Sequence, residues 1–191
     1  MADFDPAVYY VMENEGGYSD QAQDSGGVTD YGITLAFLKS IGKDGDLNND
    51  GVVDAKDVQV MTRKEAERIY NKYWWDKYKY HYIKSQIVAT KIFDMSVNMG
   101  AHRATFLFHQ CVNKFNPLHG HADDHEITPS FSKIVNSIDE HKLTMCLTSA
   151  SVQFYKNIVR RNPKNKVFLK GWLRRALKIP DVFTLKKQKD E

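Results

Sequence analysis

Apolar residues recur at intervals of three and four along most of this 191-residue chain, and this spacing constrains the fold more than any other feature. Such a period places apolar side chains on one face of an α-helix, whereas a strand needs alternation at every second residue. Strand-like alternation is nearly absent. We therefore predict a mainly α-helical protein, with helices over residues 6–15, 34–41, 62–75, 85–100, 101–115, 131–138, 139–161 and 167–177. Residues 17–33 between the first two helices read as a loop or a small irregular hairpin.

Charge is unevenly distributed along the chain. Residues 1–60 contain 12 Asp/Glu and 3 Lys/Arg, whereas residues 61–191 contain 12 Asp/Glu and 24 Lys/Arg. The acidic part can hold catalytic carboxylates and a cation, and the basic part can approach a polyanion or form a solvated surface. The basic amphipathic helix over 167–177 could contact an anionic envelope or simply dock on the core. No nucleic-acid-binding motif accompanies the basic residues, so we expect no nucleic-acid partner.

Several features expected of membrane or exported proteins are missing from the sequence. No run of about 18 apolar residues is present, which argues against a membrane-spanning helix. The first six residues lack the basic and apolar regions of a secretory signal. The two cysteines, Cys111 and Cys146, could pair with each other, but without such a signal we expect them to be buried and reduced.

Glu15 is the strongest candidate for a catalytic acid. It ends the first predicted helix and is followed by Gly16 and Gly17. The partial negative charge at a helix C-terminus disfavours an ionised carboxyl, so we expect a raised pKa for Glu15, as a glycosidase general acid requires. The glycines leave room for a bulky sugar. The alternative is an exposed glutamate at an ordinary capped helix end.

A second carboxyl group is usually needed for glycoside hydrolysis. Asp24 can return from the loop to face Glu15, and Asp20 and Asp30 compete with it for this role. Thr29 carries a hydroxyl suited to holding a water molecule. The sequence does not choose among these partners.

These residues lie in motifs that resemble the signature of glycoside hydrolase family 108. The motifs are Glu-Gly-Gly-Tyr at 15–18, Asp-Ser-Gly-Gly at 24–27 and Thr-Asp-Tyr-Gly-Ile-Thr at 29–34, with further similarity at 92–100 and 168–175. The resemblance implies a lysozyme-like helical fold and places the family's catalytic glutamate on Glu15, with further polar positions on Asp24 and Thr29. The chain departs from the family pattern at Ser25, where proline is usual, and by an insertion at about 42–58.

The resemblance implies an N-acetylmuramidase that cleaves the β-1,4 bond between N-acetylmuramic acid and N-acetylglucosamine. Residues 1–110 would form the catalytic region, and residues 111–191 would complete the fold or bind peptidoglycan. Many family members are phage endolysins, so we expect a monomer that stays in the host cytoplasm until it is released to the cell wall. The alternative is a non-catalytic, calcium-dependent module that binds cell-wall carbohydrate.

The insertion contains a segment that fits an EF-hand calcium loop. Oxygen ligands occur at the required spacing, and Gly51 occupies the position of the sharp turn. Hard oxygen ligands favour Ca²⁺ over zinc or copper. Aspartate at the twelfth position, instead of the usual glutamate, resembles the dockerin form of the loop. We predict a structural calcium ion bound by Asp46, Asn48, Asp50, Val52, Asp54 and Asp57.

Three other polar or aromatic groups have less specific patterns. Asp94 and Asn98 share a helix face and could line a cleft or satisfy buried backbone groups. At least half of the aromatic residues Trp74, Trp75, Tyr78 and Tyr80 are expected in the core. The histidines and aspartates between residues 119 and 125 are expected to form a polar surface loop and not a metal site.

Overall fold

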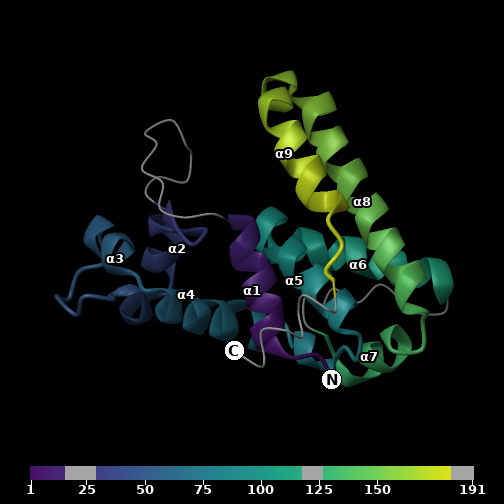
Figure 1. The fold of residues 1–191 in the computed structure, drawn as a ribbon, viewed down its shortest axis with the longest axis horizontal. Helices are drawn as coiled ribbons and strands as arrows, with labels where there is room; N and C mark the ends of the chain where they lie inside the picture. Colours follow the sequence, from purple (N-terminus) through teal and green to yellow (C-terminus); the bar gives the residue numbers. More distant parts are fainter. Residues whose placement is uncertain (16–28, 118–126, 182–191) are drawn as a thin grey trace. The chain divides into compact units, whose positions relative to one another are not determined.

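The computed structural model describes residues 1–15, 29–117 and 127–181 of the chain. Over these residues the protein is mainly α-helical, as predicted, and includes a two-stranded antiparallel hairpin (Figure 1). The chain divides into two compact units. The larger unit consists of Met1–Val11 and Asn71–Glu191, and the smaller unit consists of Met12–Tyr70.

The smaller unit begins with the last residues of helix α1. Its elements, in chain order, are the end of α1 (Phe4–Glu15), β1 (Thr29–Asp30), β2 (Ile33–Thr34), α2 (Leu35–Ser40), the 3₁₀ turn η1 (Gly42–Gly45), α3 (Ala55–Val60) and α4 (Arg63–Tyr70). Thr34 begins α2 as predicted, because its hydroxyl accepts a 3.0 Å hydrogen bond from the Phe37 amide. The fully buried side chains of Leu38, Val58 and Ile69 contribute to the core of this unit.

Besides the first part of α1, the described residues of the larger unit form five α-helices and three short helical turns. They are η2 (Asn71–Asp76), η3 (Tyr80–Tyr82), α5 (Gln86–Met99), α6 (Ala101–Phe115), α7 (Pro129–Val135), α8 (Glu140–Arg161), η4 (Pro163–Asn165) and α9 (Lys166–Leu177). Side-chain N-caps begin several of them, since Ser85, Thr128 and Asp139 each accept a hydrogen bond from an amide three residues later. Figure 1 shows α8 and α9 side by side as a helical hairpin.

Helix α5 supplies the centre of the larger unit, and every residue from Val88 to Ser96 is buried. The rings of Phe4, Trp75, Tyr80 and Phe93 pack with centroid separations of 5.6–6.3 Å. Separations in this range are typical of favourable aromatic pairs. The prediction that half of the 74–80 aromatic residues belong to the core is confirmed, since Trp75 and Tyr80 are almost wholly buried.

Buried Lys91 and partly buried Arg175 attach the C-terminal end of α9 to α5. Lys91 donates hydrogen bonds of 2.7 Å to the Ala176 carbonyl and 2.8 Å to the Lys178 carbonyl. Arg175 forms an ion pair with Asp94, with nitrogen–oxygen distances of 2.9 and 3.0 Å. Burial lowers the pKa of Lys91 to about 8 despite the nearby Asp94 carboxylate. A cation at the end of α9 also offsets the partial negative charge of the helix terminus.

The prediction that both cysteines are reduced is wrong. Cys111 of α6 and Cys146 of α8 form a disulfide, with Cα atoms 5.7 Å apart. This separation is within the range that a disulfide spans without backbone movement. Helical periodicity had shown that both residues lie on helices, but it does not reveal which helices are neighbours.

Candidate functional site

Glu15 is the last residue of α1 and belongs to the smaller unit. Its side-chain atom Oε1 is buried, although the residue as a whole is only partly covered. The last turn of α1 contains no basic residue. The partial negative charge of the helix terminus therefore lies beside the carboxyl group with no basic side chain in that turn to offset it.

The hairpin of β1 and β2 lies against this carboxyl group. Thr29 pairs with Thr34 and Asp30 pairs with Ile33, leaving Tyr31 and Gly32 as the turn. Both turn residues have positive φ, +49° and +77° respectively, as a two-residue hairpin turn of the I′ type requires. A Cβ atom on Gly32 would lie only 2.5 Å from Glu15 Oε2 and 2.6 Å from its Cγ. Glycine is thus the residue that allows the turn to approach the candidate acid this closely.

Tyr70, the last residue of the smaller unit, holds the turn of Tyr31 and Gly32 in place. It is fully buried at the end of α4, and its hydroxyl donates a 2.8 Å hydrogen bond to the Tyr31 carbonyl. The residues are 39 positions apart, so this bond fixes the hairpin by tertiary structure. Sequence reasoning missed Tyr70 because its position on an amphipathic helix indicates burial but does not identify a partner for its hydroxyl.

The hairpin also places a second carboxyl group in this region. Asp30 Oδ1 accepts a 2.9 Å hydrogen bond from the Tyr31 amide. Burial raises the pKa of Asp30, and the hydrogen bond opposes this only in part. Thr29, the candidate water-holding residue, is half-buried in β1 on the same hairpin. The structure therefore brings the Glu15 carboxyl to the hairpin that carries Thr29 and Asp30.

Asp24, the other predicted catalytic residue, lies outside the described residues, as do Asp20 and the 16–18 part of the Glu-Gly-Gly-Tyr motif. The histidine-containing segment over 119–125 also lies outside them. The roles assigned to Asp24 and Thr29 stay predictions.

The predicted calcium loop, residues 46–57, follows η1 and extends into the start of α3. The Asp46 carboxylate accepts hydrogen bonds of 3.1 Å from the Asp50 amide and 2.9 Å from the Gly51 amide. Gly51 has a φ of +88°, which agrees with its predicted place at the sharp turn. Asp54 caps α3 through a 2.8 Å bond from the Lys56 amide.

Asp57, the predicted twelfth-position ligand, is fully buried. Its Oδ1 accepts hydrogen bonds from the amides of Leu47 (2.7 Å) and Asn48 (3.2 Å), and its Oδ2 accepts one of 2.7 Å from the Asp54 amide. Burial acts to raise the pKa of Asp57, but these amide hydrogen bonds outweigh it and lower the pKa. Over the described residues, no three His, Cys, Asp or Glu side chains gather as a group able to hold a metal ion. The calcium ion stays a prediction.

Asp94 and Asn98, which the sequence placed on one helix face, both bond to side chains of the larger unit. Asp94 pairs with Arg175, and the Asn98 side-chain oxygen accepts a hydrogen bond from the Tyr155 hydroxyl. Both therefore contribute to the attachment of α8 and α9 to α5. Among the described helices, none has the length and apolar character needed to cross a membrane.

Comparison with known proteins adds evidence for both parts of the chain. Residues 8–100, which include Glu15 and the hairpin, match the family model described as Glycosyl hydrolase 108. Residues 124–177 match a second model, described as Predicted Peptidoglycan domain. Together the two matches support a peptidoglycan hydrolase, and they confirm the predicted lysozyme-like helical fold class.

The solved structure of Brucella abortus SagA is similar to this protein in fold. The TM-score is 0.71, with 98% of this chain and 94% of that chain covered at 24% sequence identity. The likeness at this identity concerns the fold alone. The comparison with curated proteins found no match.

Proposed function

We propose that this protein hydrolyses the β-1,4 bond between N-acetylmuramic acid and N-acetylglucosamine in peptidoglycan, with Glu15 as the general acid. The observation that carries the proposal is the close packing of the Gly32 turn on the Glu15 carboxyl, within a segment that matches glycosyl hydrolase 108. A proton donor must be held in a fixed position beside the glycosidic oxygen, and the hairpin supplies that constraint.

In the proposed reaction, the Glu15 carboxyl transfers its proton to the glycosidic oxygen as the bond to the anomeric carbon breaks. A water molecule then attacks that carbon and gives up a proton, either directly to the second carboxylate or, after an intermediate, to the Glu15 carboxylate. Asp24 is the favoured second carboxyl. Asp30 is a weaker candidate because one of its oxygens already accepts a backbone hydrogen bond and burial raises its pKa. The biological role that we propose is lysis of the bacterial cell wall, of the kind that phage endolysins perform.

Glu15→Gln tests the proposed acid, and Glu13→Gln is a matched control because Glu13 is exposed two residues earlier on α1. Loss of general acid catalysis should slow wall hydrolysis by about 10²–10⁴-fold in the first variant. The control should keep the wild-type rate. Both variants should keep the wild-type melting temperature, and a folded Glu15→Gln protein that still cleaves at the wild-type rate would refute the assignment. Mass analysis of the products tests the bond: new reducing-end N-acetylmuramic acid is expected, and new reducing-end N-acetylglucosamine would contradict it.

We also propose that Ca²⁺ binds the loop over residues 46–57 and stabilises the smaller unit. The ligands would be the side chains of Asp46, Asn48, Asp50, Asp54 and Asp57 and the Val52 carbonyl, and the ion would offset repulsion among the carboxylates. Thermal unfolding with excess Ca²⁺ and with EDTA tests this proposal. A higher melting temperature with Ca²⁺ is expected, and equal melting temperatures would contradict it.

A further inference from the structure

A groove runs between α6 and α8 in the larger unit and has a volume of about 420 Å³. Each wall is one face of a helix, because the lining residues of α6 and of α8 recur at spacings of three and four. The Cys111–Cys146 disulfide joins the same two helices. The volume is that of a small-ligand site, and the walls are held by a covalent link as well as by packing.

Arg103 is the charged residue of this groove that packs against aromatic rings of both walls. Its guanidinium carbon lies 5.6 Å from the ring centre of Phe106 and 5.5 Å from that of Phe154. These distances are within the range of cation–π attraction, so two rings from different helices orient one guanidinium group. An arginine held by stacking keeps its N–H donors available for a carboxylate.

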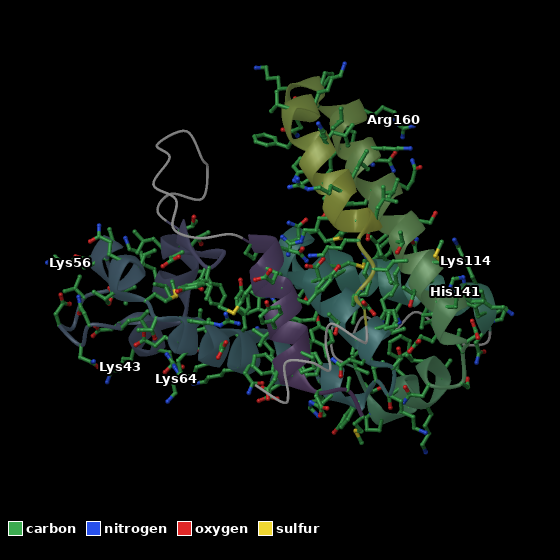
Figure 2. All side chains as sticks on the ribbon, in the orientation of Figure 1. Lys43, Lys56, Lys64, Lys114, His141 and Arg160 are labelled. Atoms are coloured by element: carbon green, nitrogen blue, oxygen red, sulfur yellow. A yellow bond between two sulfur atoms is a disulfide. The ribbon has the colours of Figure 1, made fainter. Side chains whose placement is uncertain are left out.

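The charged residues that line the groove within the described part of the chain are all basic. Lys114 and Arg161 line it together with Arg103, and none of the described lining residues is an aspartate or glutamate. Arg103 lies in the first turn of α6, Lys114 lies in its last turn and Arg161 ends α8, so the basic residues are spread along the groove and not gathered at one point. Figure 2 labels Lys114 on α6 and Arg160, which precedes Arg161, on α8. The side-chain amides of Gln110, Gln153 and Asn157 and the hydroxyl of Ser149 also line the groove. Such a surface suits a ligand with more than one carboxylate and with amide groups.

We propose that this groove binds the stem peptide of peptidoglycan through its free carboxylates. The inference rests on the proposed function, because it takes peptidoglycan as the polymer that the protein contacts. The glycan strand of that polymer is largely uncharged, whereas its stem peptides carry carboxylates and amide bonds. The α8 wall lies within the segment that matches the peptidoglycan domain model. The groove therefore recognises the peptide part of the substrate, whereas the Glu15 carboxyl group is proposed to cleave the glycan part.

The test is calorimetric titration of the full chain with a sugar-free acidic stem tetrapeptide. Arg103→Ala should weaken binding by about tenfold, the loss expected for one charge-assisted contact. Arg103→Lys keeps the charge but loses the planar guanidinium group, so its affinity for the peptide should lie between those of the wild type and Arg103→Ala. Arg161→Ala should weaken binding several-fold, whereas Arg160→Ala, which removes the adjacent charge outside the groove lining, should change it less than about twofold.

Lys114→Ala, at an exposed position on the other helix, provides a second test if Arg103→Ala fails to fold. The proposal is supported if the wild type binds the peptide and the affinities of the variants follow the stated order. No binding of the peptide, or equal losses in Arg160→Ala and Arg161→Ala, overturns it. Equal binding of a peptide-free disaccharide, or groove-dependent binding of phosphatidylglycerol vesicles without peptide binding, also overturns it. Failure of the catalytic assignment is distinguishable, because Glu15→Gln would then cleave normally while peptide binding stays intact.

Discussion

The close approach of Gly32 to Glu15 yields a quantitative prediction for Gly32→Ala. The substitution has two separable costs. At a φ of +77° an alanine is in the left-handed region, which costs about 1–2 kcal/mol. Its Cβ would also meet Glu15 Oε2 at 2.5 Å, and the resulting overpacking costs about 1–3 kcal/mol. We therefore expect Gly32→Ala to lower the free energy of unfolding by about 2–5 kcal/mol.

Gly42→Ala is the matched control for this measurement. Gly42 lies in the same unit with a φ of +59°, and an added Cβ there would meet no atom within 4 Å. This variant should therefore lose only the backbone cost of about 1–2 kcal/mol. The reduction in unfolded-state entropy on replacing glycine by alanine is similar in both variants and cancels when they are compared. The difference of about 1–3 kcal/mol reports the collision with Glu15.

Urea unfolding of both variants measures this difference, and turbidity loss of a cell-wall suspension measures the activity. Gly42→Ala should keep nearly wild-type activity per folded molecule. Gly32→Ala should lose about 100-fold, because a displacement of about 1 Å of a catalytic group can cost that much. Equal stability and equal activity in the two variants would show that the turn does not fix the Glu15 carboxyl, and the argument for Glu15 as a positioned acid would fail.

Three further substitutions test other parts of the structure. Tyr70→Phe removes the hydrogen bond to the Tyr31 carbonyl and should lower stability by about 1 kcal/mol in thermal unfolding. The fraction of the lytic rate that is lost should exceed the fraction of the unfolding free energy that is lost. In the wild type, the Lys91 pKa of about 8 in the folded state lies below the ordinary 10.5, so between these values Lys91 is protonated mainly in the unfolded chain and stability should rise with pH. Lys91→Met removes this group and should flatten the dependence of stability on pH over that range. The pKa of Asp57 is lowered in the folded state, so its carboxylate stabilises the wild type above about pH 4 and does so progressively less below it. Asp57→Asn removes this carboxylate and should therefore lose less stability on acidification than the wild type. Unfolding series across pH 8–10.5 and pH 2–6 measure the last two effects, and unchanged slopes would contradict them.

Local features of the sequence were enough to predict most helices of this fold. The predicted helix over 139–161 agrees with α8 at Glu140–Arg161, because an aspartate N-cap and sustained apolar spacing define both its start and its face. Thr34 likewise begins α2 as its position suggested. The hairpin was much harder to predict. Each strand has only two residues, too few for alternation to be visible, and its turn is Tyr-Gly where Asn-Gly would have been the stronger signal.

Contacts between residues far apart in the chain account for what the sequence did not reveal. The Cys111–Cys146 disulfide depends on α6 and α8 being neighbours, and the Tyr70–Tyr31 hydrogen bond joins two elements separated by the calcium-loop segment. Helical periodicity determines which face of each helix is buried, but several packing arrangements satisfy the same faces. Glu15 itself was found from a short motif, whereas the Gly32 turn that positions it became evident only when the hairpin was placed beside α1.

The calcium loop shows how a motif and its geometry can give different information. The motif counts oxygen atoms at the right spacing, and by that count Asp57 is a ligand. In the structure, Asp57 Oδ1 already accepts two amide hydrogen bonds and Oδ2 accepts a third. A carboxylate oxygen has two lone-pair sites, so bidentate binding of a cation at Asp57 would require at least some of these bonds to lengthen or break. The calcium binding proposed for this loop would therefore be coupled to a rearrangement of the amides of Leu47, Asn48 and Asp54, and part of its binding free energy would offset those lost bonds.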